Sequence, residues 1–401
     1  MILIPWFAMF HNLIHEYEYN GVKGHLNTVN WSFLPDGSTK SQYEDQMFLE
    51  HQRVDLIKQF LESDQIRTAA DHAQITIVPG WDCNLRCTHC VVIDKLTKPG
   101  ITKNKIDVSQ FKCFVDDYMD LLSKKHLQLN FVGGEPLLYV DVINNLVSLM
   151  DQCDYKVRYG MTTNLAQPLS VNQLEMLKSF SNITVSIDGN EHLHNQQRLP
   201  IYDTKNVYAD VINNLKILTI NGLIDKVFVQ AALTLDKFKE KEHIKDFFKT
   251  LLKLGIKKDS IKVFSQHPTP RKPNFSSSNT QLPAPKLRTV SCCRHRKSNL
   301  LVNYNGEVCS DYYSLTKLGH VSDTAQSVYD NYVNDIDNLP VLNDDKCHQC
   351  NVLSFCWGGC TNQHDEYNNP SDNCSQMELQ KLNQKSIASQ SYNTRIKEAT
   401  K

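Results

Sequence analysis

Residues 74–90, QITIVPGWDCNLRCTHC, contain the pattern that decides the fold of this chain. Ile75–Val78 is a short apolar run typical of a buried strand. Directly after it come Cys83, Cys87 and Cys90, in the spacing C-x3-C-x2-C. Three thiolates on one short loop suit a cubane iron–sulfur cluster that keeps one iron free for a small ligand. Structural zinc sites more often use four ligands, commonly arranged as C-x2-C pairs.

Between residues 74 and 266, short apolar strands alternate with segments of helical periodicity. The sequence predicts six strands, at Ile75–Val78, Leu127–Val132, Val157–Met161, Ile183–Ile187, Val227–Leu235 and Ile261–Ser265, with helices near 107–123, 140–152, 171–180, 204–220 and 237–254. Strands separated by crossover helices pair in parallel, so we expect an α/β fold with an open sheet or a partial barrel. In such folds the loops after the strands build the site.

The composition excludes several classes of protein. The chain has 401 residues, of which 22% are charged, and its net charge is -1. This balance argues against a general binder of nucleic acid or of anionic membranes. No stretch approaches the ~18 apolar residues of a membrane span. The apolar start, Met1–Phe10, lacks the basic region and cleavage site of a signal peptide. We therefore expect a cytoplasmic protein.

The 13 cysteines are an odd number, and without a secretory signal they indicate metal ligation rather than a disulfide framework. A second group has the spacing C-x2-C-x5-C-x3-C, and comprises Cys347, Cys350, Cys356 and Cys360, with Cys292, Cys293 and Cys309 before it and Cys374 after it. Taken alone, this group suits zinc as well as iron–sulfur. Cys113 and Cys153 lie in helical segments, and we expect both to be buried small hydrophobic residues.

Further motifs follow the next strands in chain order. They are Gly133-Gly134-Glu135-Pro136 after the second strand, Thr162-Thr163-Asn164 after the third, Ser186-Ile187-Asp188-Gly189 after the fourth, and Arg198 beyond. Paired glycines let the backbone approach a ligand, and Glu135 or a neighbouring carbonyl can accept a hydrogen bond from an ammonium. The guanidinium of Arg198 suits a carboxylate. The competing roles are a surface ion pair for Arg198 and strand-end turns for Asn164 and Ser186.

With these motifs in this order, residues 74–374 resemble the radical S-adenosylmethionine (radical SAM) superfamily. The resemblance implies a partial (β/α)6 TIM-like barrel in which Cys83, Cys87 and Cys90 hold a [4Fe–4S] cluster that binds SAM. It assigns contacts with SAM to Gly133, Gly134, Glu135, Pro136, Asn164, Ser186 and Arg198. His89 departs from the family pattern, which usually has an aromatic residue before the third cysteine, but its imidazole can still stack on adenine.

The second cysteine group resembles the SPASM extension of peptide-modifying radical SAM enzymes, which holds two auxiliary [4Fe–4S] clusters. By that pattern, the outer cluster takes Cys347, Cys350, Cys356 and Cys374, and the inner cluster takes Cys293, Cys309 and Cys360. The fourth position of the inner cluster is open to Cys292, to substrate or to an unidentified ligand. Asp311, just past Cys309, is a candidate base near the inner cluster, and capping of a hairpin is its competing role.

The expected organisation has five parts. They are an N-terminal region (1–73), a radical SAM core (74–266), a Pro/Ser-rich linker (267–291), a small Cys-rich SPASM domain (292–374) and a polar tail (375–401). In the N-terminal region we expect a hairpin near residues 33–38 and an amphipathic helix over 43–63, with a hypothetical peptide-binding role. A second hairpin is expected at Asn305-Gly306.

Together these features predict an oxidoreductase that cleaves SAM to a 5′-deoxyadenosyl radical and oxidatively modifies a peptide or protein side chain. The resemblance favours crosslinking of a ribosomally synthesised precursor peptide, with a one-electron donor such as flavodoxin or ferredoxin. Auxiliary clusters favour net oxidation because they can accept the electron that the substrate loses. Two alternatives stay open: a sulfatase-maturase-like enzyme that generates formylglycine, and a non-catalytic zinc-binding protein.

Overall fold

The computed structural model describes residues 14–19, 22–27, 33–35, 72–202, 206–234, 241–266, 299–310, 312 and 315–337. The chain divides into two compact units, one made of residues 1–67, 274–296 and 333–401 and the other of residues 68–273 and 297–332. No helix among these described residues is long and apolar enough to cross a membrane.

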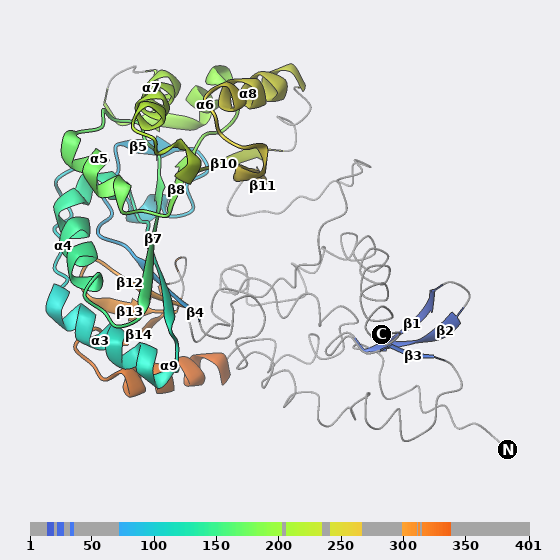
Figure 1. Cartoon of the computed structure of the whole chain (residues 1–401), viewed down its shortest axis with the longest axis vertical. Helices are drawn as coiled ribbons and strands as arrows, with labels where there is room; N and C mark the ends of the chain where they lie inside the picture. The colour runs from blue at the N-terminus through green and yellow to red at the C-terminus, as the bar shows by residue number, and fades with distance from the viewer. Residues whose placement is uncertain are drawn as a thin grey trace. The chain divides into compact units, whose positions relative to one another are not determined.

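In the first unit, the described residues form a small antiparallel sheet of three strands, β1 (Ile14–Tyr19), β2 (Val22–Asn27) and β3 (Phe33–Pro35) (Figure 1). Phe33–Pro35, at the start of the hairpin predicted near residues 33–38, is a strand, and residues 36–38 lie outside the described residues. The overlooked signal is Asn20-Gly21, which separates β1 from β2 in the sequence. Asn-Gly is the pair most typical of two-residue hairpins. The predicted helix over 43–63 lies outside the described residues.

The second unit is built on a nine-stranded sheet, in the order β11-β10-β8-β7-β6-β4-β12-β13-β14. Six of its strands follow one another in chain order and are all parallel: β4 (His72–Ile77), β6 (His126–Phe131), β7 (Lys156–Thr163), β8 (Asn182–Ser186), β10 (Val227–Thr234) and β11 (Ile261–Gln266). The six predicted strands and their parallel pairing are thus confirmed.

Helices connect these strands, as the periodicity predicted. They are α3 (Val108–Leu121), α4 (Val140–Met150), α5 (Val171–Lys178), α7 (Val207–Ile220) and α8 (Lys241–Lys253). In Figure 1, α3, α4 and α5 form a row along one side of the sheet. Local chemistry sets where helices begin: Asp107 caps α3, and Ser170 with Gln173 forms a capping box at α5. This is the predicted partial (β/α)6 barrel.

The helix-covered face of the sheet carries the core. Along β4 and β6 buried and half-buried residues alternate, and the buried set includes Ile75, Ile77 and Leu129. Phe131 on β6 lies 5.7 Å, centroid to centroid, from Phe180 after α5. Each buried side chain of this size contributes about 1.5–3 kcal/mol relative to an exposed one. Burial therefore sets which residues of each strand face the helices.

Residues beyond the six strands extend the same sheet. β12 (Asn299–Val302) pairs in parallel with β4, and β13 (Glu307–Cys309) and β14 (Lys317–His320) continue it in antiparallel fashion, before α9 (Ala325–Asp337). The hairpin predicted at Asn305-Gly306 is present between β12 and β13. Gly306 has a φ of 84° there, which glycine adopts at little cost. The predicted Cys-rich domain (292–374) includes these three strands. In the structure, β12 instead pairs directly with β4, the first of the six parallel strands.

The two isolated cysteines differ from expectation. Cys113 is exposed and Cys153 is half-buried, and both are free thiols. The buried residues of α3 are Phe111, Phe114, Val115, Tyr118 and Met119. Cys113 lies outside that stripe, so helical position outweighs the general preference of cysteine for burial.

Candidate active site

The cysteine loop leaves the carboxyl end of β4 and is organised by a buried carboxylate. Asp82 accepts hydrogen bonds from Thr97 Oγ1 (2.6 Å), from the backbone N–H of Gly100 (2.5 Å) and from that of Thr102 (2.8 Å). Burial alone would raise the pKa of Asp82. The hydrogen bonds lower it by more than burial raises it, so the net pKa lies below the usual value. Asp82, directly before Cys83, therefore connects the start of the cysteine loop to residues 97–102, which follow the last cysteine. Its position in the sequence did not indicate this role.

The three thiols of this loop differ in exposure. Cys83 is buried, Cys87 and Cys90 are half-buried, and all are free. A turn joins the last two, because the backbone N–H of Cys90 donates to the carbonyl of Cys87 at 3.2 Å. Burial raises the pKa of Cys83 to about 12 and that of Cys87 to about 11, and it also raises the pKa of Cys90. The metal-free thiols are therefore protonated at neutral pH, and metal binding must release their protons.

Two nitrogen donors are directed at these sulfurs. Arg198 Nη1 lies 3.8 Å from Cys87 Sγ, and Asn164 Nδ2 lies 3.8 Å from Cys83 Sγ. Arg198 comes close because β5 (Leu85–Cys87) pairs antiparallel with β9 (Arg198–Pro200), which sets it opposite Cys87. Hydrogen bonds to sulfur stabilise thiolates and tune the potential of a cluster that they bind.

Three free thiols on one short loop are a donor set that suits a cubane iron–sulfur cluster. His89 Nδ1, between the last two cysteines in sequence, is buried and has no hydrogen-bond partner among the described residues. Such an unsatisfied polar atom is costly, and a bound ligand would satisfy it.

The Gly133–Pro136 loop, after β6, is joined to the cysteine loop through its backbone. The N–H of Gly134 donates to the carbonyl of Gly80 (3.1 Å), and that of Glu135 donates to the carbonyl of Asp82 (2.8 Å). A Cβ on Gly134 would lie 2.1 Å from the carbonyl oxygen of Asp82. This approach is closer than any side chain permits, so glycine is required at position 134.

The Glu135 side chain is used within the chain. Its carboxylate is buried and accepts from Thr163 Oγ1 (2.6 Å), the N–H of Asn164 (2.7 Å) and the N–H of Leu137 (3.0 Å). Burial raises its pKa, although these bonds oppose that shift. Glu135 thus holds the end of β7, and with it Asn164, beside the cysteine loop.

Arg198 forms a buried bidentate ion pair rather than a surface pair. Asp188 Oδ2 accepts from Nε (2.7 Å) and Oδ1 from Nη2 (3.1 Å), and the N–H of Ala232 donates to Oδ1 (2.8 Å). Burial alone would raise the pKa of Asp188, but Arg198 and His89 hold it below its usual value. The Nε edge of the guanidinium is therefore occupied, and Nη1 faces Cys87. Asp188 appeared in a sequence motif without an assigned role.

Comparison with known proteins gives structural matches only. No protein-family model matches the chain, and no curated protein sequence matches it. The structure of anSMEcpe with bound AdoMet and the Cp18Cys peptide aligns with a TM-score of 0.54 at 15% identity, covering 72% of this chain and 89% of that chain. Streptococcus suis SuiB bound to S-adenosylmethionine aligns with a TM-score of 0.52 at 14% identity, covering 90% and 97%. Both structures contain bound S-adenosylmethionine, and the fold that they share with this chain is the partial barrel expected from the sequence. The chain has the radical SAM fold.

On the radical SAM fold, the described site residues gather at the carboxyl edge of the parallel strands. Ser186 ends β8 beside the end of β7, and Pro136 is buried at the start of η4 (Pro136–Tyr139). Cys309 is buried on β13, in an apolar cluster with Val78, Trp81, Val92 and Leu301 against which Cys90 also packs. The predicted base, Asp311, lies outside the described residues, and so do the predicted cluster ligands Cys292, Cys293, Cys347, Cys350, Cys356, Cys360 and Cys374.

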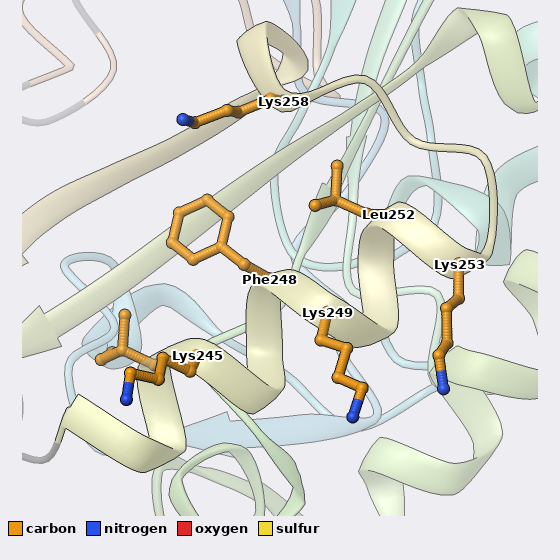
Figure 2. A pocket seen from close by; sticks show the side chains of 7 residues that line it. Lys245, Phe248, Lys249, Leu252, Lys253 and Lys258 are labelled. Carbon is orange, nitrogen blue, oxygen red and sulfur yellow. The ribbon is translucent and has the colours of Figure 1, made fainter.

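A pocket elsewhere on the radical SAM fold is separate from this site. It is lined by Ile244, Phe248 and Leu252 and by Lys245, Lys249, Lys253 and Lys258 (Figure 2). These residues belong to α8 and to η7 (Lys258–Ser260), before β11. The pocket takes no residue from the loops after the strands, so it has no part in the chemistry of the cysteine loop.

Proposed function

We propose that this chain is a radical SAM/SPASM enzyme that cleaves SAM and oxidatively modifies a peptide or protein side chain. The observation that carries the proposal is the convergence, on a radical SAM fold, of a free three-cysteine loop with nitrogen donors directed at two of its sulfurs. Cys83, Cys87 and Cys90 would hold a [4Fe–4S] cluster, which with SAM bound would supply radical chemistry able to act on unactivated C–H bonds.

The chain's own residues have three tasks in this proposal. Asn164 and Arg198 donate toward the thiolates, and Asp188 orients Arg198 for this purpose. The Gly133–Pro136 loop offers backbone acceptors to the SAM ammonium. The apolar cluster around Trp81 and Leu301 excludes water from the Cys90 side of the loop. Exclusion of water limits side reactions of a reactive intermediate.

A peptide is the proposed substrate, and crosslinking of a ribosomally synthesised precursor is the proposed reaction. One structure with the same fold, anSMEcpe, contains a bound peptide. Two auxiliary [4Fe–4S] clusters would accept the electron that the substrate loses. Their proposed ligands are Cys293, Cys309 and Cys360 for the inner cluster and Cys347, Cys350, Cys356 and Cys374 for the outer one. Cys309, packed in the same apolar cluster as Cys90, supports an inner centre on the SAM side. Asp311 is the proposed base.

The first test is iron and sulfide per chain after anaerobic reconstitution, together with a 5′-deoxyadenosine assay. We expect about 12 iron atoms, from three four-iron clusters. The variant C83A/C87A/C90A should lose about four of them and all deoxyadenosine formation. About four iron atoms with zinc would remove the auxiliary clusters and favour a redox-neutral reaction. Zinc alone, with no deoxyadenosine, would leave a non-catalytic zinc protein.

The formylglycine-generating alternative differs in its substrate. It requires turnover of a short Cys- or Ser-containing peptide without a leader segment, whereas a precursor-crosslinking enzyme requires its own precursor. Mass spectrometry of the product separates the two. Conversion of a short cysteine peptide to an aldehyde would overturn the crosslinking proposal and leave the SAM chemistry intact.

A further inference from the structure

The turn after β13 reaches back to the loop that follows β6. Tyr312, in this turn, donates from its hydroxyl to the carbonyl oxygen of Gly133 at 3.0 Å, across 179 positions of sequence. Its ring lies 5.9 Å, centroid to centroid, from that of Trp81. It also packs against the apolar cluster that contains Cys309. The Tyr312 ring thus packs against apolar residues, while its hydroxyl bonds the carbonyl oxygen of Gly133.

That atom belongs to a backbone segment whose N–H groups bond the segment that leads into the cysteine loop, while the Glu135 side chain bonds the end of β7. The N–H groups of Gly134 and Glu135 donate to carbonyls of the segment that leads into the cysteine loop. Gly133 itself has a φ of 129°, and a Cβ there would lie 2.6 Å from the carbonyl oxygen of Gly80. The Gly133 carbonyl shares a planar peptide unit with the N–H of Gly134, so the bond from that N–H to Gly80 and the bond from the Tyr312 hydroxyl hold opposite ends of this unit and together set the direction of the carbonyl.

We propose that Tyr312 is a positioning residue for SAM, which acts by fixing the Gly133 carbonyl as an acceptor for the SAM ammonium. A carbonyl oxygen accepts two hydrogen bonds. Tyr312 takes one, and the other is the one proposed for the SAM ammonium. This inference rests on the proposed function, and it identifies a contribution to the SAM site from a residue three positions after Cys309, far outside the motifs of the barrel.

The contacts at the ends of the turn support this role. Before Tyr312, Cys309 pairs with Leu301 on β12 and with Lys317 on β14. The N–H of Ser310 donates to the carbonyl of Thr316 at 3.0 Å, which closes the turn. These bonds pair the described residues on both sides of Tyr312, and its own ring contact and hydrogen bond place the hydroxyl at Gly133 before SAM binds.

The test compares Y312F with Y304F in the iron–sulfur-reconstituted full chain. Tyr304 packs against the same apolar cluster, and its described hydrogen bonds are made by its backbone, so Y304F removes a hydroxyl without touching Gly133. The dissociation constant for SAM is measured by equilibrium dialysis, and the electron paramagnetic resonance spectrum of the reduced cluster is recorded with and without SAM. Thermal midpoints of both variants provide the fold control.

We expect Y312F to raise the dissociation constant for SAM about 3- to 10-fold, which corresponds to one lost hydrogen bond. At a fixed, subsaturating SAM concentration, its SAM-induced spectral change should shrink, while the rate at saturating SAM and the thermal midpoint stay close to wild type. Y304F should bind SAM within about twofold of wild type. Unchanged SAM affinity in Y312F would overturn the proposal, and so would equal weakening in both variants. A wild-type chain that binds no SAM would instead overturn the proposed function.

Discussion

The buried pair of Asp188 and Arg198 leads to a quantitative prediction. Asp188 has no exposed surface and Arg198 is 8% exposed, and the two share a bidentate ion pair. D188N keeps the size of the side chain but removes its charge, so Arg198 remains buried without a counter-charge. Breaking a buried pair in this way costs about 3–5 kcal/mol. We expect D188N to lower the free energy of unfolding by this amount.

The control is an exposed pair of the same charge type on α5. Glu175 and Lys178 lie 2.6 Å apart, at i and i+3, with more than half of each side chain exposed. Solvent screens such a pair, so E175Q should cost about 0–1 kcal/mol. Urea unfolding of the full chain, followed by circular dichroism, gives both values. If D188N costs no more than E175Q, the ion pair does not carry a buried charge and the assignment is wrong.

Three further predictions concern other parts of the fold. G134A places a Cβ 2.1 Å from the carbonyl oxygen of Asp82, so it should cost about 1–3 kcal/mol or displace the loop. G222A adds a Cβ with no atom within 4 Å but at a φ of 71°, so it should cost about 1–2 kcal/mol from backbone strain alone and leave the site intact. If G134A neither costs more than G222A nor weakens SAM binding, the steric explanation is refuted. L129A empties a fully buried site of β6 and should cost about 2–5 kcal/mol, whereas I220A, at a position that is 84% exposed, should change stability by about 0.5 kcal/mol or less. The pKa of His194 is lowered from 6.5 to about 3, chiefly by burial and then by Arg198. Folding therefore keeps this ring neutral, so its contribution is complete above pH 6.5 and decreases as the pH falls toward 3 while the unfolded chain takes up a proton. Between pH 7 and pH 5 the wild type should lose about 2 kcal/mol more than H194Q does, measured by urea unfolding at both pH values; equal losses would contradict a neutral buried His194.

Local patterns in the sequence were enough to predict the parallel strands and the helices between them, whereas the choice of a partial barrel over an open sheet came from the family resemblance. Strand and helix periodicity depends on which residues of a short segment are apolar, and the six strands and their connecting helices follow it. The spacing of Cys83, Cys87 and Cys90 is equally local, and so is the Asn305-Gly306 hairpin. The prediction missed α6 (Glu191–Gln197), a polar helix of two turns without a clear apolar stripe, and the short pair β5–β9, whose strands each have three residues.

The sequence by itself determined that three thiols follow a first parallel strand, because spacing along a chain constrains a loop directly. Only the tertiary structure decided which side chains meet those thiols and how the loops are held. Arg198 lies opposite Cys87 through β-pairing, Glu135 bonds the end of β7, and Tyr312 reaches Gly133 across 179 positions. Such contacts depend on how distant strands are brought together, and the closure of a long loop leaves no periodic trace in the residues that it joins.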